Sequence, residues 1–149
     1  EGGIRLPFII TCGSHLTPGK SNHAGQFVDI MPTFAELAGV EAPANDGISL
    51  VPTLTGGEQP KHEYLYWEFP GGKGWVAVRW GEWKGIVKNV HKGNNVMELY
   101  DLHTDLRETT DVAAQYPEVV EQMWKFIKES HQPVPNDVQR YKMTINFPE

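Results

Sequence analysis

The histidines are the first residues of this sequence that could do chemistry, but their spacing does not form a site. They stand at positions 15, 23, 62, 91, 103 and 131. The sequence has no HExxH motif, no pair of histidines at the i,i+4 spacing of two ligands on one helix face, and no histidine beside a pair of thiolates. We therefore expect surface or turn histidines and no metal site in this chain.

Two other patterns resemble catalytic motifs. Residues 71–74 read Gly-Gly-Lys-Gly, but they lack the spacing and the trailing Ser or Thr of a phosphate-binding loop, and no helix is expected after them. A hairpin turn is the better interpretation. Cys12, Ser14 and His15 could supply a nucleophile and a base, yet neighbouring side chains on an extended loop point apart and no third group orients them. We assign no catalytic residue within the chain.

Tryptophan is the most distinctive residue of the second half of the sequence, at positions 67, 75, 80, 83 and 124. Each indole can fill a core, or it can form a platform on which a sugar ring stacks. We expect core positions for Trp83 and Trp124. Both interpretations stay open for Trp75, because it follows a glycine-rich loop.

The pattern of apolar residues predicts which elements position these side chains. A short apolar run at 5–11 predicts a buried strand, residues 12–26 a surface loop, and residues 29–39 a helix that Asp29 caps or complements and Gly39 ends. Residues 48–54 form an apolar patch that should pack flat against a core. The helix should present one apolar face, made by Ile30, Phe34, Leu37 and Ala38.

The second half predicts an antiparallel meander covered by a helix. Four aromatic and β-branched runs, at 63–69, 75–80, 83–90 and 96–102, are separated by glycine-rich turns. Pro117 then opens an amphipathic helix, and residues from 132 onwards should be extended or irregular. The loop-rich stretch at 40–62 is the best boundary, which gives domains at 1–59 and 60–149. The apolar stripe of the helix comprises Val119, Val120, Met123, Trp124 and Ile127.

Composition excludes several classes of protein. With 149 residues, 40% of them hydrophobic and 21% charged, the chain has the composition of one globular domain rather than of a disordered segment. Its net charge is −6 and its basic residues are scattered, so nucleic acid is not an expected partner. No apolar run has the length of a membrane span. The single Cys12 excludes an internal disulfide, and the start at Glu1 suggests a processed or excised segment.

Five phrases of the sequence lie at 1–9, 29–39, 46–54, 77–84 and 98–108. In this order they resemble the C-terminal third of a type I sulfatase of the arylsulfatase-like, alkaline-phosphatase superfamily. The resemblance implies an α+β fold in which a C-terminal four-stranded antiparallel sheet is packed by one long helix. A strand–loop–helix remnant of an alkaline-phosphatase-like α/β domain precedes it, so that 1–59 would be the incomplete end of the catalytic domain and 60–149 the C-terminal subdomain.

The resemblance also implies where the chemistry would lie. Such sulfatases hydrolyse sulfate esters with a formylglycine, made from the Cys or Ser of a C/S-x-P-x-R motif, beside a bound Ca²⁺. Cys12 is not followed by that Pro and Arg, and Asn45-Asp46-Gly47 is a structural turn rather than the metal-binding phrase. The parent protein is therefore expected to use Ca²⁺ and formylglycine, whereas this chain alone is predicted to hold no cofactor and to be inactive.

By the same resemblance, Glu1 and Arg5 should brace a missing loop that carries the sulfate-binding lysine. The substrate-rim candidates are Trp67, Glu68, Lys73 and Trp75, because a lysine favours an anionic sulfated sugar and an indole can stack on its ring. The expected partner is a sulfated small molecule or glycan, met in the periplasm or outside the cell. Whether the formylglycine of the parent protein is made from Cys or from Ser stays open.

Two further expectations follow from the sequence. A free-standing carbohydrate-binding module that uses the sheet tryptophans is the alternative to a sulfatase fragment. Because a strand at 5–11 and the apolar face of the following helix would lack the sheet on which they normally pack, the N-terminal segment could also pair two copies of the chain.

Overall fold

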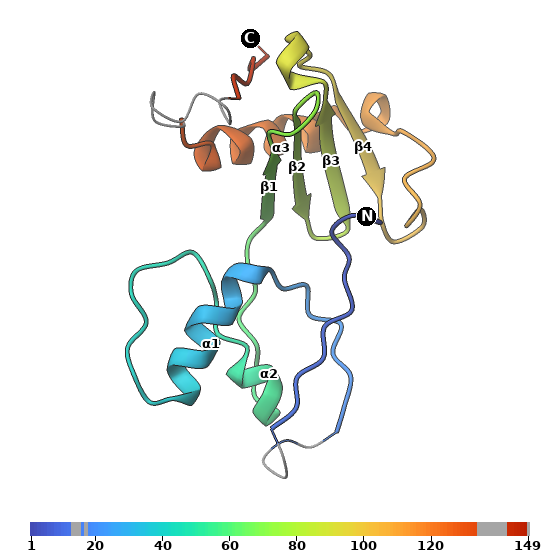
Figure 1. Ribbon diagram of the computed structural model, residues 1–149. Coiled ribbons are helices and arrows are strands. Elements are labelled where there is room, and N and C mark those ends of the chain that lie inside the picture. Colours follow the sequence, from blue (N-terminus) through green and yellow to red (C-terminus); the bar gives the residue numbers. More distant parts are fainter. Residues whose placement is uncertain (13–15, 17, 134–142, 149) are drawn as a thin grey trace. The chain divides into compact units, whose positions relative to one another are not determined.

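The computed structural model describes residues 1–12, 16, 18–133 and 143–148, and the chain forms two compact units (Figure 1). One unit contains Glu1–Arg5 and Tyr64–Glu149, and the other is Leu6–Glu63. We call them the sheet unit and the helical unit. The assignment of 1–59 and 60–149 to two domains of a sulfatase stays a prediction.

The sheet unit contains the predicted antiparallel meander. Its strands are β1 (Leu65–Phe69), β2 (Trp75–Trp80), β3 (Trp83–Lys88) and β4 (Met97–Asp101), and each pairs with the next in the order β1-β2-β3-β4. The two-residue turn between β2 and β3 uses Gly81 at φ 60°, a conformation that the tight turns of hairpins require. Two short 3-10 helices, Val90–Lys92 (η2) and Ala113–Gln115 (η3), flank β4.

Helix α3 (Pro117–Ser130) covers one face of this sheet, as predicted (Figure 1). Val78, Leu99, Met123 and Ile127 are fully buried where helix and sheet meet, and each such side chain contributes about 1.5–3 kcal/mol by leaving water. The approach is close at Gly85, where an added Cβ would lie 2.6 Å from two methionine sulfurs.

The tryptophans expected in the core lie where predicted. Trp124 is buried in the cluster between helix and sheet. Trp83 is half-buried and packs against that cluster, with its ring centroid 4.7 Å from that of Tyr116. Trp75, for which both interpretations were open, is 47% exposed.

The helical unit contains a 3-10 turn at Phe27–Asp29 (η1), helix α1 (Ile30–Leu37) and helix α2 (Val51–Thr55). Residues 48–54, expected as an apolar patch packed against a core, are buried or half-buried, and the helix within them was not predicted. Pro52 suits the first turn of a helix, and Gly56, at φ 80°, ends it, so that the segment forms the short helix α2. No described helix is long and apolar enough to cross a membrane.

Asp29 has a different role from the one predicted. Its carboxylate is fully buried and does not cap α1. Instead it accepts hydrogen bonds from the backbone N–H of Gln26 at 2.7 Å and of Ile48 at 2.8 Å, and from Nε2 of His62 at 2.7 Å. The Asp29 side chain therefore joins three separate segments of the helical unit. Their donors also satisfy the carboxylate, because a buried charge needs hydrogen-bond partners.

The strand predicted at 5–11 does not form; these residues have no regular secondary structure. A strand needs a neighbour for its backbone hydrogen bonds, and the one sheet among the described residues contains only β1 to β4. Leu6 and Ile9 consequently stay 75% and 84% exposed, and Phe34 on α1 is 61% exposed. The predicted apolar face of α1 thus exists, but it faces solvent.

Candidate functional site

The register of the strands decides which predicted site residues share a face. Residues that pair across neighbouring strands project to the same side of a sheet, and successive residues of one strand project to opposite sides. Val76 and Val78 lie in the cluster packed against α3, so Trp75 and Ala77 project from the other face. We call this other face the open face. It carries Leu65, Trp67, Phe69, Trp75, Ala77, Arg79, Lys84, Ile86, Lys88, Glu98 and Tyr100.

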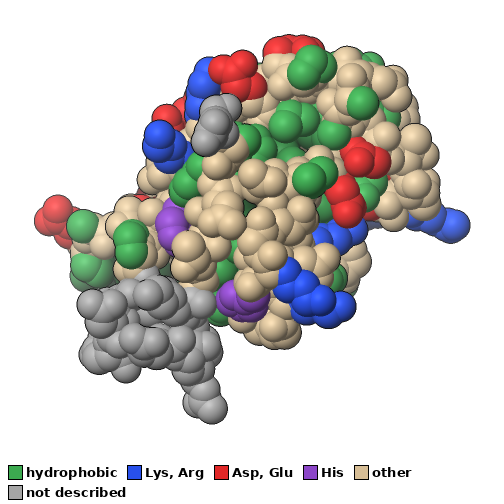
Figure 2. All heavy atoms as spheres, turned by 90° about the horizontal axis from the view of Figure 1, so that it is seen from above, with side chains coloured by type: hydrophobic (Ala, Val, Ile, Leu, Met, Phe, Trp, Pro, Cys, Tyr) green, Lys and Arg blue, Asp and Glu red, His purple; other side chains and the backbone are tan. Residues whose placement is uncertain are grey.

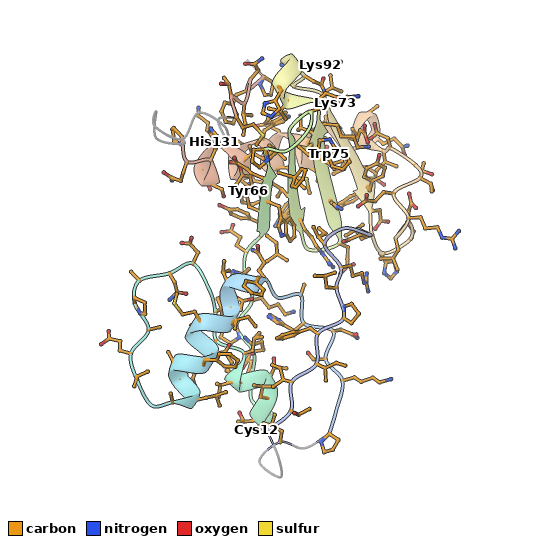
Figure 3. The ribbon with its side chains drawn as sticks, in the orientation of Figure 1. Cys12, Tyr66, Lys73, Trp75, Lys92 and His131 are labelled. Atoms are coloured by element: carbon orange, nitrogen blue, oxygen red, sulfur yellow. The ribbon has the colours of Figure 1, made fainter. Side chains whose placement is uncertain are left out.

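Lys73 lies in the turn between β1 and β2, and this turn is fastened to the turn after β3. The carbonyl of Lys73 accepts the N–H of His91 at 3.0 Å, and the His91 ring donates from Nε2 to the carbonyl of Pro70 at 2.8 Å. Gly74 has φ 75°, and an added Cβ would lie 3.0 Å from the His91 ring. The structure thus holds the backbone of Lys73 while its side chain is exposed (Figure 3).

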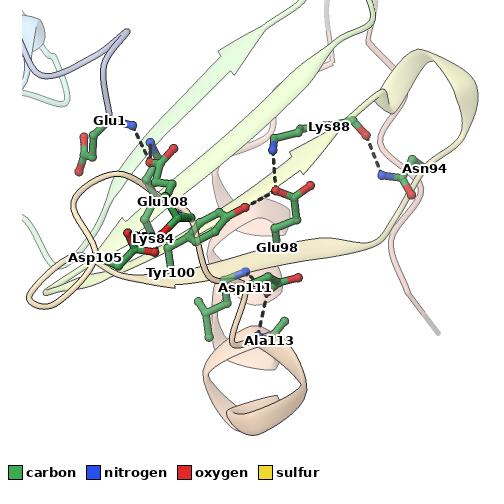
Figure 4. Close-up of polar contacts among 12 residues, drawn as sticks. Glu1, Lys84, Lys88, Asn94, Glu98, Tyr100, Asp105, Glu108, Asp111 and Ala113 are labelled. Carbon is green, nitrogen blue, oxygen red and sulfur yellow. Dashed lines mark hydrogen bonds and ion pairs between the residues drawn. The ribbon is translucent and has the colours of Figure 1, made fainter.

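Trp75 stands beside Phe69 on one side and Lys88 on the other, because it pairs with both. Phe69 is 64% exposed. The Lys88 ammonium donates to Glu98 Oε2 at 2.5 Å, and that oxygen also accepts the Tyr100 hydroxyl at 2.5 Å (Figure 4). Burial and the Glu98 carboxylate raise the pKa of Tyr100, so its hydroxyl stays protonated and remains a donor.

Glu68 lies on the face that α3 covers, away from the open face that carries Trp67 and Trp75. Its carboxylate accepts hydrogen bonds from the Tyr66 hydroxyl and, at 2.7 Å, from Nδ1 of His131, which follows α3. Burial and this carboxylate raise the pKa of Tyr66. The structure therefore brings Trp67 and Trp75 to one face, whereas Glu68 links β1 to His131 at the end of α3.

Glu1 is braced against the sheet unit, as Figure 4 shows. Its ammonium donates to Glu108 Oε1 at 2.6 Å, and its own carboxylate lies 3.8 Å from the Arg79 guanidinium. Lys84, a buried residue of β3, donates to the same oxygen of Glu108. Arg5 contributes a backbone N–H to the carbonyl of Glu1 at 2.9 Å, and its side chain is exposed, with no ion pair among the residues that the structure describes.

Lys84 and Glu108 are the polar residues that the sequence reasoning missed. A signal for Lys84 was present, because a lysine at an inner position of an apolar strand needs an acceptor when it is buried. The partner could not be read from the sequence, since Glu108 lies 24 residues further on in a loop. Glu108 has φ 55°, a left-handed conformation that costs a residue other than glycine free energy.

No described residues fit a Ca²⁺ site. Within residues 1–12, 16, 18–133 and 143–148, no group of three or more His, Cys, Asp or Glu side chains could hold a metal ion. Asn45 serves as a turn residue, as predicted: its Oδ1 accepts the N–H of Gly47 at 2.8 Å and its amide donates to the carbonyl of Pro43 at 2.7 Å. This arrangement is an Asx turn, so we derive no step through a metal here.

Comparison with known proteins gives a consistent result. The family model for the C-terminal region of N-sulphoglucosamine sulphohydrolase matches residues 1–133. A sulfatase of Formosa agariphila is 31% identical over 137 residues, which is 78% of this chain and 24% of that protein. Choline-sulfatase of Rhizobium meliloti is 33% identical over 120 residues, 76% of this chain and 22% of the relative. The solved structure of a 2-O GAG sulfatase is 27% identical with a TM-score of 0.59, over 79% of this chain and 27% of that one.

The chain therefore belongs to the N-sulphoglucosamine sulphohydrolase C-terminal family, the C-terminal region of type I sulfatases. This confirms the resemblance and the α+β fold class expected from it. The chain spans about a quarter of the length of these relatives, so the activity and the substrate of a whole protein belong to the proposal that follows.

Proposed function

We propose that this chain is the C-terminal part of a sulfatase that hydrolyses sulfate esters of carbohydrate, and that it supplies scaffold and substrate-rim residues to a catalytic centre located elsewhere in a longer protein. The observation that carries the proposal is the family match over residues 1–133. Relatives whose names contain a sugar support carbohydrate as the class of substrate. One is an N-acetylgalactosamine-6-O-sulfatase of Bacteroides thetaiotaomicron, 28% identical over 142 residues.

The geometry of the open face supports a role at a substrate rim. Trp67 and Trp75 project from it, and the turn that carries Lys73 is fixed by three hydrogen bonds to the next turn. An exposed indole offers an apolar face to a sugar ring, and an exposed ammonium offers charge to a sulfate ester. Glu68 is more suited to positioning, because both of its partners hold it on the side of α3.

An activity assay tests this proposal directly. The 149-residue chain, given 4-nitrophenyl sulfate and Ca²⁺, should release no 4-nitrophenol above the buffer rate. A longer protein that contains this chain should hydrolyse the ester, and replacing the Cys or Ser of its C/S-x-P-x-R motif by Ala should abolish turnover, because the formylglycine that the resemblance implies could not form. Turnover by the 149-residue chain, or none by the longer protein, contradicts the proposal.

A free-standing carbohydrate-binding module is the second candidate, favoured by the exposure of Phe69 and Trp75 on the open face. The mass of the native gene product separates the two candidates. A sulfatase should be several times longer than this chain, as its relatives are, whereas a module could end near its present length. Export to the periplasm or the medium, which the resemblance implies, is part of the sulfatase proposal.

Self-association through the N-terminal segment is a separate proposal about this chain in isolation. Ile9 and Phe34 are 84% and 61% exposed, and burying such side chains between two copies would be favourable. Light scattering should show a dimer that the double variant Ile9→Ser, Phe34→Ser abolishes. The control is Val96→Ser, which removes a 65% exposed apolar side chain from the sheet unit. A monomeric parent chain, or a dimer that survives the double variant, would exclude this interface.

A further inference from the structure

The open face ends in a row of three side chains beside the turn at 70–74. Phe69 pairs with Trp75, and Trp75 pairs with Lys88, so the three lie side by side on β1, β2 and β3. We call Phe69, Trp75 and Lys88 the outer row. Trp67 lies in the next row, where it pairs with Ala77. Because Ala77 is small, the large side chains at this end of β1 and β2 on the open face are Trp67, Phe69 and Trp75.

The exposure of the outer row is not explained by packing. Phe69 and Trp75 are 64% and 47% exposed and neither belongs to the hydrophobic cluster under α3. Adjacent exposed aromatic rings on a rigid strand pair favour a binding surface over a core. The ring of Phe69 lies close to Gly71, where an added Cβ would come within 2.8 Å of it.

The charges beside these rings are mainly positive. Lys88 is positioned by its 2.5 Å bond to Glu98, whose other contact is the Tyr100 hydroxyl. Lys73 follows Phe69 in the turn, and its backbone is bonded to η2, which carries Lys92. Neither Lys73 nor Lys92 forms an ion pair with another described residue, and both are exposed. Figure 2 shows the molecule from above, the side on which Figure 3 labels Lys73 and Lys92, and acidic as well as basic side chains are exposed there.

We propose that the outer row binds a sulfated oligosaccharide, with the rings of Trp75 and Phe69 against the C–H face of a sugar and the ammonium groups of Lys88 and Lys73 on its sulfate esters. The choice of a sulfated ligand rests on the proposed function. Two features of the row favour this ligand: exposed aromatic rings match the C–H face of a sugar, and the ammonium groups beside them match an anion. Lys88 and Phe69 are additions to the site, and Glu68 takes no part in it.

Nuclear magnetic resonance of the five indole N–H groups tests the proposal with internal controls. Trp67 and Trp75 project from the open face, whereas Trp83 and Trp124 pack with the cluster on the side of α3. The ¹⁵N-labelled chain is titrated with a chondroitin 6-sulfate hexasaccharide and, separately, with the unsulfated chondroitin hexasaccharide. The sulfated ligand should shift the Trp75 signal most and leave Trp83 and Trp124 unchanged.

Variants identify the groups that bind. Trp75→Ala and Lys88→Gln should each weaken binding of the sulfated hexasaccharide, by about tenfold for the indole and about threefold for the ammonium. The matched control is Lys128→Gln. It removes the same charge from an exposed position on α3 and should leave the dissociation constant unchanged. Each variant's spectrum is compared with the parent's before titration to show that the sheet is intact.

The outcomes separate this inference from the proposed function. Equal binding of both hexasaccharides, shifts confined to Trp83 or Trp124, or equal losses for Lys88→Gln and Lys128→Gln would each overturn the outer row as the site. No binding at all would also overturn it. None of these results alters the 4-nitrophenyl sulfate assay on a longer protein, since that small ester needs no oligosaccharide-binding surface. If the longer protein fails that assay while the outer row still binds the sulfated hexasaccharide, the sulfatase proposal is wrong and the chain is a carbohydrate-binding module.

Discussion

In the 149-residue chain, where Glu1 carries the terminal ammonium, replacing Glu108 by Gln should destabilise the sheet unit more than removing its lysine partner does. Lys84 is 3% exposed and donates to Glu108 Oε1, which also accepts the Glu1 ammonium at 2.6 Å. Glu108→Gln leaves two cations facing a neutral amide. Breaking a buried pair in this way costs about 3–5 kcal/mol, and the lower end applies because the Glu108 side chain is 19% exposed.

Lys84→Met is the matched variant. It keeps the length and the apolar stem of the side chain, and it leaves Glu108 paired with the Glu1 ammonium, so we expect a loss of only about 1–2 kcal/mol. The double variant should lose less than the sum of the two single losses, because it leaves one cation, the Glu1 ammonium, facing the amide, whereas Glu108→Gln alone leaves two. These differences are large against a total stability of about 5–15 kcal/mol.

Urea unfolding followed by tryptophan fluorescence measures these losses in the relevant unit, because all five tryptophans lie between residues 64 and 149. A loss below about 0.5 kcal/mol for Glu108→Gln would place it among ordinary surface substitutions and refute the reasoning. A loss for Lys84→Met equal to that for Glu108→Gln would also refute it, since the asymmetry comes from the second cation.

Three further outcomes are expected. Burial alone would raise the pKa of Glu108, but hydrogen bonds from Lys84 and the Glu1 ammonium hold this pKa below its ordinary value of 4.5. The ion pair therefore stabilises the fold above pH 4.5, and this stability is lost as the pH falls through the lowered pKa. In a urea series from pH 6 to pH 3, Lys84→Met should lose less unfolding free energy than the parent. Gly85→Ala should lower the free energy of unfolding by about 1–3 kcal/mol, because its Cβ would lie 2.6 Å from two buried methionine sulfurs. The control Gly3→Ala, whose Cβ would have nothing within 4 Å, should unfold at the parent's urea midpoint. Equal midpoints for the two variants would disprove the close contact. Limited proteolysis read by mass spectrometry should cut first within 40–46, which is exposed and has no helix or strand, and an early cut within β2 or β3 would contradict this order.

The sequence predicted elements well where a local pattern determines them. The four strands and α3 were placed within a few residues, since alternation, turn glycines and Pro117 are local signals. The strand at 5–11 failed because pairing depends on a partner outside the segment. Helix α2 was missed because five residues are too few to show a helical period, and the bonds of Asp29 join positions up to 33 residues apart.

The candidate site was predicted less well than the fold. Trp67 and Trp75 stay predictions as rim residues. Trp75 was chosen because it follows a glycine-rich loop, and both were chosen by the resemblance; their sharing of a face depends on a register that the sequence does not display. Glu68 was grouped with them although it adjoins Trp67, and neighbours in a strand project to opposite faces. That rule was available from the sequence. The bond to His131, 63 residues away, was not.

The two contacts of Glu108 differ in how much chain must be ordered before each can form. The bond to Lys84 spans 24 residues, whereas the bond to Glu1 spans 107. Closing a loop of the longer span costs about 1 kcal/mol more in chain entropy than closing the shorter one. The β2–β3 hairpin pairs residues from Trp80 with Trp83 to Trp75 with Lys88, which are 3 to 13 positions apart. We therefore expect the meander to form before residues 1–5 dock on it. A chain arrested before that event would have a complete sheet with an open acceptor at Glu108.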